Sequence, residues 1–204
     1  MEKKIIKLSE SQKDALKEIG SICAGNAATA LSQLLNKKIE IEVPQVFFVP
    51  VEEVPSVIGE DRLVVGLVVK ILGDFPSVIL LIFPHQDALN LASLLTGKKP
   101  SNGAVITELE RSALKEIGII IANAYLQALI VFIRWGLVPT VPEVIEDMAE
   151  AMIDYILIEL SNVSPFALLI KSEFREKTTK ITGHFFLIPN PKGLEFFLEA
   201  IRDF

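Results

Sequence analysis

The sequence places an acidic side chain twice at the same point of the same hexapeptide. Residues 15–20 and residues 113–118 both read ALKEIG, which puts Glu18 and Glu116 in equivalent positions. On a helix, residues three or four apart share a face, so each carboxylate would act together with residues one turn away. These neighbours are Asp14 and Ser21 in the first copy, and Ser112 and Ile119 in the second. The pattern fits a duplicated surface site, and it fits equally well two exposed helix residues kept by shared ancestry.

Other familiar chemical motifs are absent from the sequence. It contains no P-loop, no GxGxxG, no HExxH and no paired set of His and Cys. The two histidines, His85 and His184, stand apart, and we expect them at the surface or in turns. The single cysteine, Cys23, has no partner for a disulfide or a metal site, so we expect it to serve packing. A group of acidic residues is predicted on the solvated face of a helix: Glu146, Asp147 and Glu150.

The two hexapeptides belong to longer copies of one pattern, which must position the carboxylates. Aligned without gaps, the copies share further identities, including Pro44 with Pro142, so we infer an internal duplication. Each copy opens with a long predicted helix, in which apolar residues recur at every third or fourth position. Capping-box spacings stand at the two helix starts: Ser9 with Gln12, and Thr107 with Glu110.

The rest of each copy reads as strands followed by a second helix. In the first copy we expect a strand from Ile39 to Pro44, a hairpin from 62–72 and 77–83, and a helix over 84–97. In the second copy we expect a helix from Glu143 to about Leu160, strands near 165–175 and 180–188, and a helix over 191–204.

This order of elements predicts an α+β fold, because strands follow one another directly and no regular βαβ alternation is present. We expect one pseudo-twofold domain over residues 1–204, with repeats at about 9–97 and 107–204 and a linker between them. Its sheet is predicted to be mainly antiparallel and covered by long helices. Two separable domains are disfavoured, since each half alone would leave a large apolar face uncovered.

In these residues the chain resembles the CheC/FliY/CheX family of chemotaxis phosphatases, and most of all its CheC branch. The family pattern is Asp or Ser, three residues, Glu, two residues, Asn, twenty-two residues, Pro. At these spacings the first copy has Asp14, Glu18, Ser21 and Pro44, and the second has Ser112, Glu116, Ile119 and Pro142. The resemblance spans nearly the whole chain.

The resemblance implies a protein that acts on the aspartyl phosphate of the response regulator CheY. In the family, the Glu engages a lysine of the regulator near its phosphorylated aspartate, and the Asn orients a water for in-line attack on phosphorus. The regulator carries the Mg²⁺, so no cofactor or metal of this chain is implied. In phosphoryl transfer of this kind, the protein contributes chiefly by positioning the reacting groups and stabilising charge.

The sequence departs from the family pattern at the residue that orients the water. The Asn is replaced by Ser21 in one copy and by Ile119 in the other. A serine hydroxyl can hold a water, but it reaches less far than an amide and lacks the amide's paired donor and acceptor. Isoleucine can hold no water. We therefore expect impaired phosphatase activity, since loss of a well-placed catalytic group costs on the order of 10²–10⁴ in rate.

The sequence is compatible with three functions. The first is a slow CheY-P phosphatase. The second is a non-catalytic adaptor that binds phosphorylated CheY through Glu18 and Glu116, or docks the deamidase CheD. For CheD the resemblance points to the region after the second proline, with Glu146, Asp147 and Glu150 as contacts. The third is a structural role similar to that of the middle domain of FliM, against which the retained Asp/Ser, Glu and Pro positions count.

The composition limits the classes of partner and the cellular compartment that we expect for this protein. A net charge of −6 and a pI near 5.1 argue against nucleic acid or an anionic membrane as the main partner. One cysteine and the lack of a signal-peptide pattern favour the cytoplasm. The uncharged stretch from Ile117 to Ile133 is barely long enough for a membrane span, and Asn123 and Gln127 interrupt it. We therefore expect it to be a buried central helix.

Overall fold

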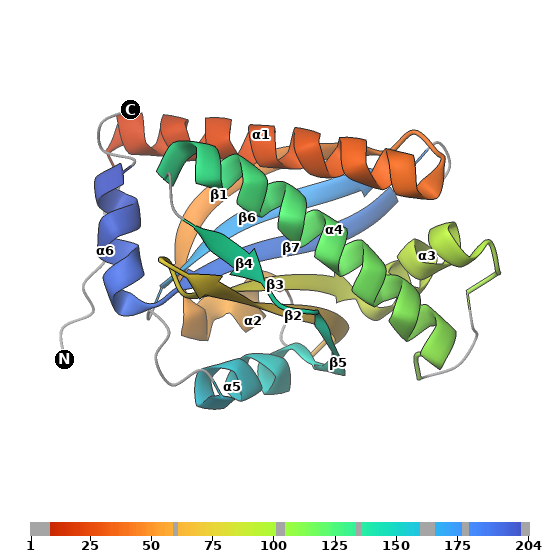
Figure 1. The fold of residues 1–204 in the computed structure, drawn as a ribbon. Helices are drawn as coiled ribbons and strands as arrows, with labels where there is room; N and C mark the ends of the chain where they lie inside the picture. Colours follow the sequence, from red (N-terminus) through yellow and green to blue (C-terminus); the bar gives the residue numbers. More distant parts are fainter. Residues whose placement is uncertain are drawn as a thin grey trace.

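The computed structural model describes residues 9–58, 61–100, 105–133, 136–159, 166–176 and 180–200. Helices and strands follow one another in a similar order in both halves of the chain, as the duplication predicts (Figure 1). The first half comprises α1 (Glu10–Leu35), β1 (Glu40–Pro50), the 3-10 turn η1 (Val51–Glu53), α2 (Val54–Ile58), β2 (Leu63–Gly73), β3 (Ser77–Pro84) and α3 (His85–Thr96). The second comprises α4 (Glu108–Ile133), β4 (Leu137–Pro139), β5 (Glu143–Met148), α5 (Ala149–Glu159), β6 (Phe166–Arg175), β7 (Lys180–Pro189) and α6 (Pro191–Ala200).

Both predicted capping boxes are confirmed. At the start of α1 the hydroxyl of Ser9 accepts from the Gln12 amide at 3.2 Å, and the Ser9 amide donates to Gln12 Oε1 at 2.9 Å. At the start of α4 the Thr107 amide donates to Glu110 Oε2 at 2.9 Å, and the Glu110 amide donates to Thr107 Oγ1 at 3.3 Å. These bonds satisfy backbone donors that would otherwise lack partners in the first turn of each helix.

The described residues form one seven-stranded sheet in which the two halves exchange strands. The order is β1-β6-β7-β3-β2-β4, with β5 also paired to β2, and each pairing is antiparallel. The first strand of each repeat therefore pairs with the hairpin of the other repeat. The two hairpins meet at the β3–β7 pairing in the middle of the sheet, on the pseudo-twofold axis. This confirms the α+β, mainly antiparallel, pseudo-twofold fold.

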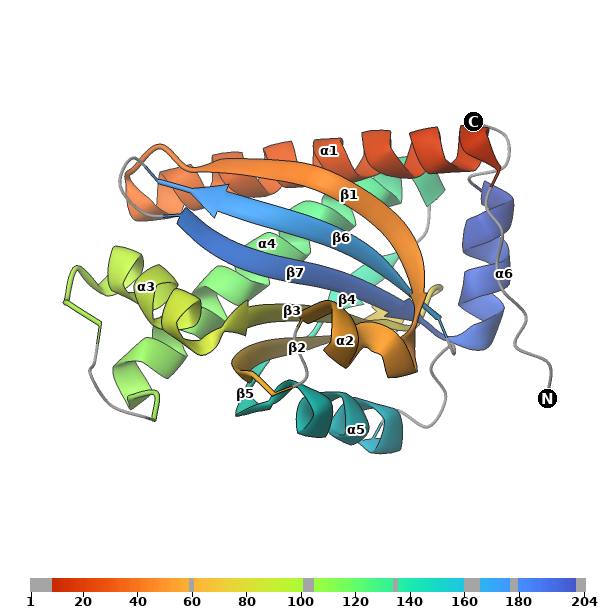
Figure 2. The same cartoon turned by 180° about the vertical axis from the view of Figure 1, so that it is seen from behind.

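The sheet is covered by helices on both faces. Figures 1 and 2 show α1 and α4 lying across one face, with α2 and α5 on the other. Alternation along β2 divides its side chains between two apolar cores, because successive residues point to opposite faces. Val65, Leu67 and Val69 pack under α1, α3 and α4, whereas Val64 and Val68 pack with α2 and α5. Both long helices are thereby held rigidly against the sheet.

Helix α4 is the buried central helix that the sequence predicts. By length and composition alone, Glu108–Val131 would suffice to cross a membrane, but 56% of its most apolar window is buried inside the fold. Its buried side includes Leu114, Ile117 and Tyr125, and the Tyr125 ring stacks on Phe185 of β7 with centroids 3.9 Å apart. The apolar character of α4 is explained by this packing between α1, α3 and the sheet.

Two expectations about the helix from Glu143 and about the histidines are wrong. Residues 143–148 form strand β5 instead of the first turns of a helix, because they pair with β2 from Val68 to Leu63. Only Ala149–Glu159 is helical. The histidines are also not surface residues: His184 is 6% exposed within β7, and the His85 side chain is 14% exposed at the start of α3.

Candidate functional site

Helix α1 presents the predicted site residues of the first repeat on its exposed face. Leu16, Ile19 and Cys23 are at most 1% exposed and fix the rotation of the helix against the core. The same helical period leaves Asp14, Glu18 and Ser21 exposed to solvent, on one stripe. The packing therefore holds these three residues outward on a long, rigid element.

Helix α4 repeats this arrangement with one difference. Leu114 and Ile117 are fully buried, and Ser112 and Glu116 are exposed. Ile119, the counterpart of Ser21, is only half-buried. Figure 1 shows α1 and α4 on the same side of the sheet, in contact with one another. The two carboxylates thus belong to one helical layer.

Neither carboxylate is used by the fold itself. Within the described part of the chain, Glu18 and Glu116 form no hydrogen bond or ion pair. By contrast, Glu10 on α1 pairs with Lys13 at 2.7 Å, and Glu110 caps α4. An exposed, unpaired carboxylate on a rigid helix can accept hydrogen bonds from a cationic group of another molecule.

At positions 21 and 119, which the family pattern assigns to water binding, neither repeat offers a free hydrogen-bond donor on its side chain. The Ser21 hydroxyl donates to the backbone carbonyl of Lys17 at 2.8 Å, one turn back in the same helix. Its only proton is therefore engaged, and only its lone pairs remain to bind a water. Ile119 has no polar side-chain atom.

Pro142 and Gly118 lie together beneath the exposed face of α4. Pro142 is buried, and a Cβ added at Gly118 would lie 3.4 Å from Pro142 Cγ and 3.0 Å from Leu67 Cδ1. The glycine of ALKEIG in α4 is thus the point where the helix approaches β2 and the proline. Pro44 lies in edge strand β1, where the pairing with β6 shifts register between Glu42 and Gln45.

The prolines mark the same interruption of strand pairing in the two repeats. Pro142 occupies the gap between β4 and β5, at the position where β1 has its register shift around Pro44. A proline lacks the backbone N–H that a strand ladder needs, so it interrupts pairing in both copies. One long strand in the first repeat corresponds to two short strands in the second.

The acidic residues predicted for CheD binding do not share one helical face. Glu146 and Asp147 lie on β5 and point to opposite sides of it, and only Glu150 lies on α5. Asp147 and Glu150 are exposed, but the Glu146 side chain is 12% exposed and already engaged. The prediction of a solvated helical patch is therefore wrong.

Glu146 instead forms a junction that sequence reasoning missed. Its Oε1 lies 2.8 Å from Nε2 of His85 at the start of α3, and its Oε2 accepts from the amide of Ile106 at 3.1 Å. Nearby, Arg111 Nη1 donates to the Val144 carbonyl at 2.7 Å. These contacts tie β5 to the beginning of α4. The sequence signal was the duplication, because the 98-residue offset between the copies aligns residues 143–148 with residues 45–50 of β1.

Cys23 serves packing, as expected. It is 0% exposed, its thiol donates to the Tyr125 carbonyl at 3.7 Å, and burial raises the pKa of the thiol to about 12. A thiol this far from ionisation is a poor nucleophile and metal ligand. Within the described ranges, no group of three or more His, Cys, Asp and Glu is arranged to hold a metal ion.

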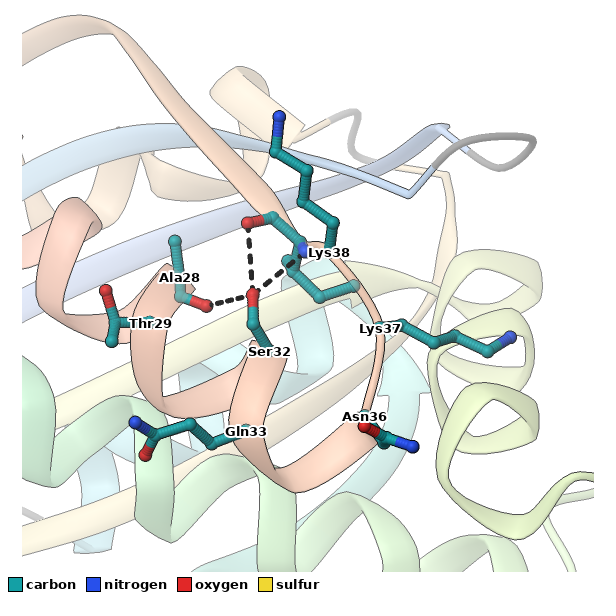
Figure 3. A pocket seen from close by; sticks show the side chains of 8 residues that line it. Ala28, Thr29, Ser32, Gln33, Asn36, Lys37 and Lys38 are labelled. Carbon is teal, nitrogen blue, oxygen red and sulfur yellow. Dashed lines mark hydrogen bonds between the residues drawn. The ribbon is translucent and has the colours of Figure 1, made fainter.

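A second surface feature lies at the other end of α1. A shallow, open depression of about 650 Å³ is lined by residues from the last turns of the helix and the start of β1 (Figure 3): Ala28, Thr29, Ser32, Gln33, Asn36, Lys37, Lys38 and Ile39. The Ser32 hydroxyl donates to the Ala28 carbonyl at 2.6 Å and accepts from the Ile39 amide at 2.9 Å. This bonding joins α1 to β1, so we regard the depression as a structural joint.

Comparisons with known proteins agree with the fold and the motif. The CheC-like family model matches residues 12–48, which contain the first copy of the motif. The CheY-P phosphatase CheC of Bacillus subtilis strain 168 is 32% identical over 199 residues, which cover 95% of each chain. The crystal structure of Thermotoga maritima FliY superposes with a TM-score of 0.71 at 20% identity, covering 96% of this chain and 100% of that one.

A more distant structure shows the fold in a complex. The CheX–CheY–BeF3–Mg²⁺ complex from Borrelia burgdorferi matches with a TM-score of 0.52 at 18% identity, covering 82% of this chain and 96% of that one. At this identity the match shows the fold alone. The similarity to the B. subtilis protein, in contrast, extends over nearly the full length of both sequences. The chain therefore belongs to the CheC-like family.

Proposed function

We propose that this protein binds the phosphorylated form of a CheY-type response regulator and promotes, slowly, the hydrolysis of its aspartyl phosphate. The observation that carries the proposal is the pair of exposed carboxylates, Glu18 and Glu116, which the fold presents at equivalent positions and which form no hydrogen bond or ion pair with the residues that the structure describes. Membership of the CheC-like family supports it, since one member with 32% identity is a CheY-P phosphatase.

In this proposal each carboxylate accepts a hydrogen bond from the lysine beside the phosphorylated aspartate. A charge-assisted bond of this kind fixes the orientation of the regulator on the helix. The residue one turn later then faces the phosphoryl group and holds the attacking water. The metal ion belongs to the substrate, because Mg²⁺ comes with the phosphorylated regulator, and the chain itself needs no cofactor.

The activity is proposed to be impaired because the water-holding residue is weak in both copies. Ser21 can offer only lone pairs while its proton is bound to the Lys17 carbonyl. Ile119 can offer nothing polar. The first site would therefore retain slow hydrolysis, and the second would bind without catalysis. Asp14 and Ser112 support these sites from the same helices, Pro44 from β1, and Pro142 from the gap between β4 and β5.

The second candidate function is a non-catalytic adaptor, and the same chemistry of Ser21 and Ile119 favours it. The carboxylates would then bind phosphorylated CheY without turning it over. CheD stays a predicted partner, with Asp147 and Glu150 as its available contacts. A cytoplasmic location likewise stays a prediction.

Phosphate release from a CheY receiver loaded with acetyl phosphate and Mg²⁺ tests the proposal. We expect the chain to accelerate release above the receiver's own rate, and we expect Glu18→Gln to remove most of the acceleration. Glu10→Gln and Glu108→Gln are matched controls, because both are exposed acidic residues in the first turn of the same two helices. Binding without acceleration would replace the enzyme by the adaptor, and absence of binding would reject both.

A further inference from the structure

Within the described part of this chain, no steric contact or backbone conformation requires glycine at position 25, in the middle of α1. It is exposed, and a Cβ added to it would meet no atom within 4 Å. Its backbone is helical, inside Glu10–Leu35, so no turn or positive φ requires glycine. Glycine is the least favourable residue in a helix interior after proline. Alanine would fit here and make a better helix.

Other glycines in the fold have clear structural reasons. A Cβ at Gly66 would collide with Met152, and one at Gly183 would collide with Phe83 and Phe174. Gly73 and Gly97 have φ values of 114° and 68°, a region that side chains disfavour. In each case the glycine makes room for another part of this chain or allows a turn. By the same reasoning, Gly25 makes room for something outside it.

Gly25 lies on the same helical stripe as the proposed catalytic carboxylate. Glu18, Ile22, Gly25 and Thr29 follow at spacings of four, three and four residues, which align them along one face. Ile22 is 40% exposed, although it is a large apolar residue. Thr29 directs its hydroxyl back into the helix, where it donates to the Gly25 carbonyl at 2.9 Å. The stripe is therefore a partly apolar helical surface that begins at the carboxylate of Glu18.

We propose that Ile22, Gly25 and Thr29 form the surface on which the phosphorylated receiver rests while Glu18 reaches its lysine. Gly25 is the point where an element of the receiver comes against the backbone of α1. This inference rests on the proposed function and names the part of the chain that selects its partner. Continuity with Glu18, which in the proposed function accepts a hydrogen bond from the lysine of the receiver, identifies the occupant.

Helix α4 lacks this partly apolar surface, so the sites at Glu18 and Glu116 are unequal. The residue of α4 equivalent to Gly25 is Asn123, whose side chain is half-buried. The exposed isoleucine has its counterpart in Ile120, which packs partly against the core. The receiver would therefore dock closely on α1, and α4 would offer only its carboxylate.

Receiver binding to variants of α1 tests the inference. The probe is a CheY receiver loaded with beryllofluoride and Mg²⁺, and its dissociation constant is measured by calorimetry. We expect Gly25→Leu to weaken binding at least tenfold and Gly25→Ala to weaken it a few-fold, while both variants keep or raise the melting temperature. Ser11→Leu is the matched control, because Ser11 lies seven residues before Glu18 on the same exposed face and Gly25 lies seven residues after it.

The outcomes separate this inference from the proposed function. If wild type binds and both Gly25 variants bind equally well, the docking surface is wrong and the proposed function stands. If Ser11→Leu weakens binding as much as Gly25→Leu, the footprint does not extend in the proposed direction. If wild type shows no binding to the loaded receiver, the proposed function and the docking surface fail together.

Discussion

Restoring an amide at position 21 is expected to raise the phosphatase activity sharply. In Ser21→Asn the side chain becomes longer and gains a donor and an acceptor that can hold a water together. The hydrogen bond from the Ser21 hydroxyl to the Lys17 carbonyl, with 2.8 Å between the two oxygens, is then absent and no longer occupies the side chain at this position. A well-placed group of this kind contributes on the order of 10²–10⁴ in rate, which corresponds to about 2.7 to 5.4 kcal/mol in the activation barrier.

The stability of the protein is expected to change little, so that activity can be read directly. Position 21 is exposed, and Ser and Asn have similar helix propensities, so the free energy of unfolding should change by less than about 0.5 kcal/mol. Ile119→Asn differs, because this residue is half-buried and loses apolar burial worth on the order of 1 kcal/mol. The first repeat is thus the better place to restore catalysis.

The assay is single-turnover phosphate release from a CheY receiver loaded with acetyl phosphate and Mg²⁺. Wild type, Ser21→Asn, Ile119→Asn and the double variant are compared at equal receiver occupancy. We expect Ser21→Asn to be faster than wild type by at least a factor of about 100. An unchanged rate, with unchanged affinity for the receiver, would refute the role given to position 21. A wild type that is already as fast as Ser21→Asn would refute it equally.

Three further predictions concern the scaffold. Gly118→Ala should lower the free energy of unfolding by about 1–3 kcal/mol through overpacking against Leu67 and Pro142, measured by urea denaturation. Burial raises the pKa of the Cys23 thiol from its ordinary value of 9.0 to about 12, so the contribution of the buried thiol to stability is complete below pH 9 and is lost as pH rises towards 12. The loss of stability between these pH values should be smaller in Cys23→Ala than in wild type, by up to about 1.4 kcal/mol per pH unit, and identical slopes would contradict the assignment. Because the repeats exchange strands, the whole chain should unfold in one calorimetric transition and neither repeat should fold alone; two separate transitions would show independent halves.

Local signals in the sequence were sufficient for the helix ends and the hairpins. The Ser9 and Thr107 capping boxes, the positive-φ stop at Gly97 and the β2–β3 hairpin depend on residues that are close together in the chain. The exposure of Glu18 and Glu116 was also predictable, because the helical period of buried residues around them is regular. Features that depend on short-range geometry can be predicted from one sequence.

Features that depend on distant pairing were missed. Residues 143–148 are rich in acidic side chains, which favoured a helix start, but pairing with β2 makes them a strand. The duplication held the missing information, since these residues align with the end of β1. His184 lies in the central strand β7, and the role of Glu146 depends on His85 and Ile106 from two other segments.

The central claim is that Glu18 and Glu116 bind the phosphorylated regulator, and one binding measurement tests it most directly. The dissociation constant of a CheY receiver carrying beryllofluoride and Mg²⁺ is measured for wild type and for the double variant Glu18→Gln with Glu116→Gln. Both side chains are exposed and unpaired within the described residues, so the fold should be unaffected. We expect the double variant to bind at least tenfold more weakly, whereas equal affinity in wild type and double variant would contradict the account.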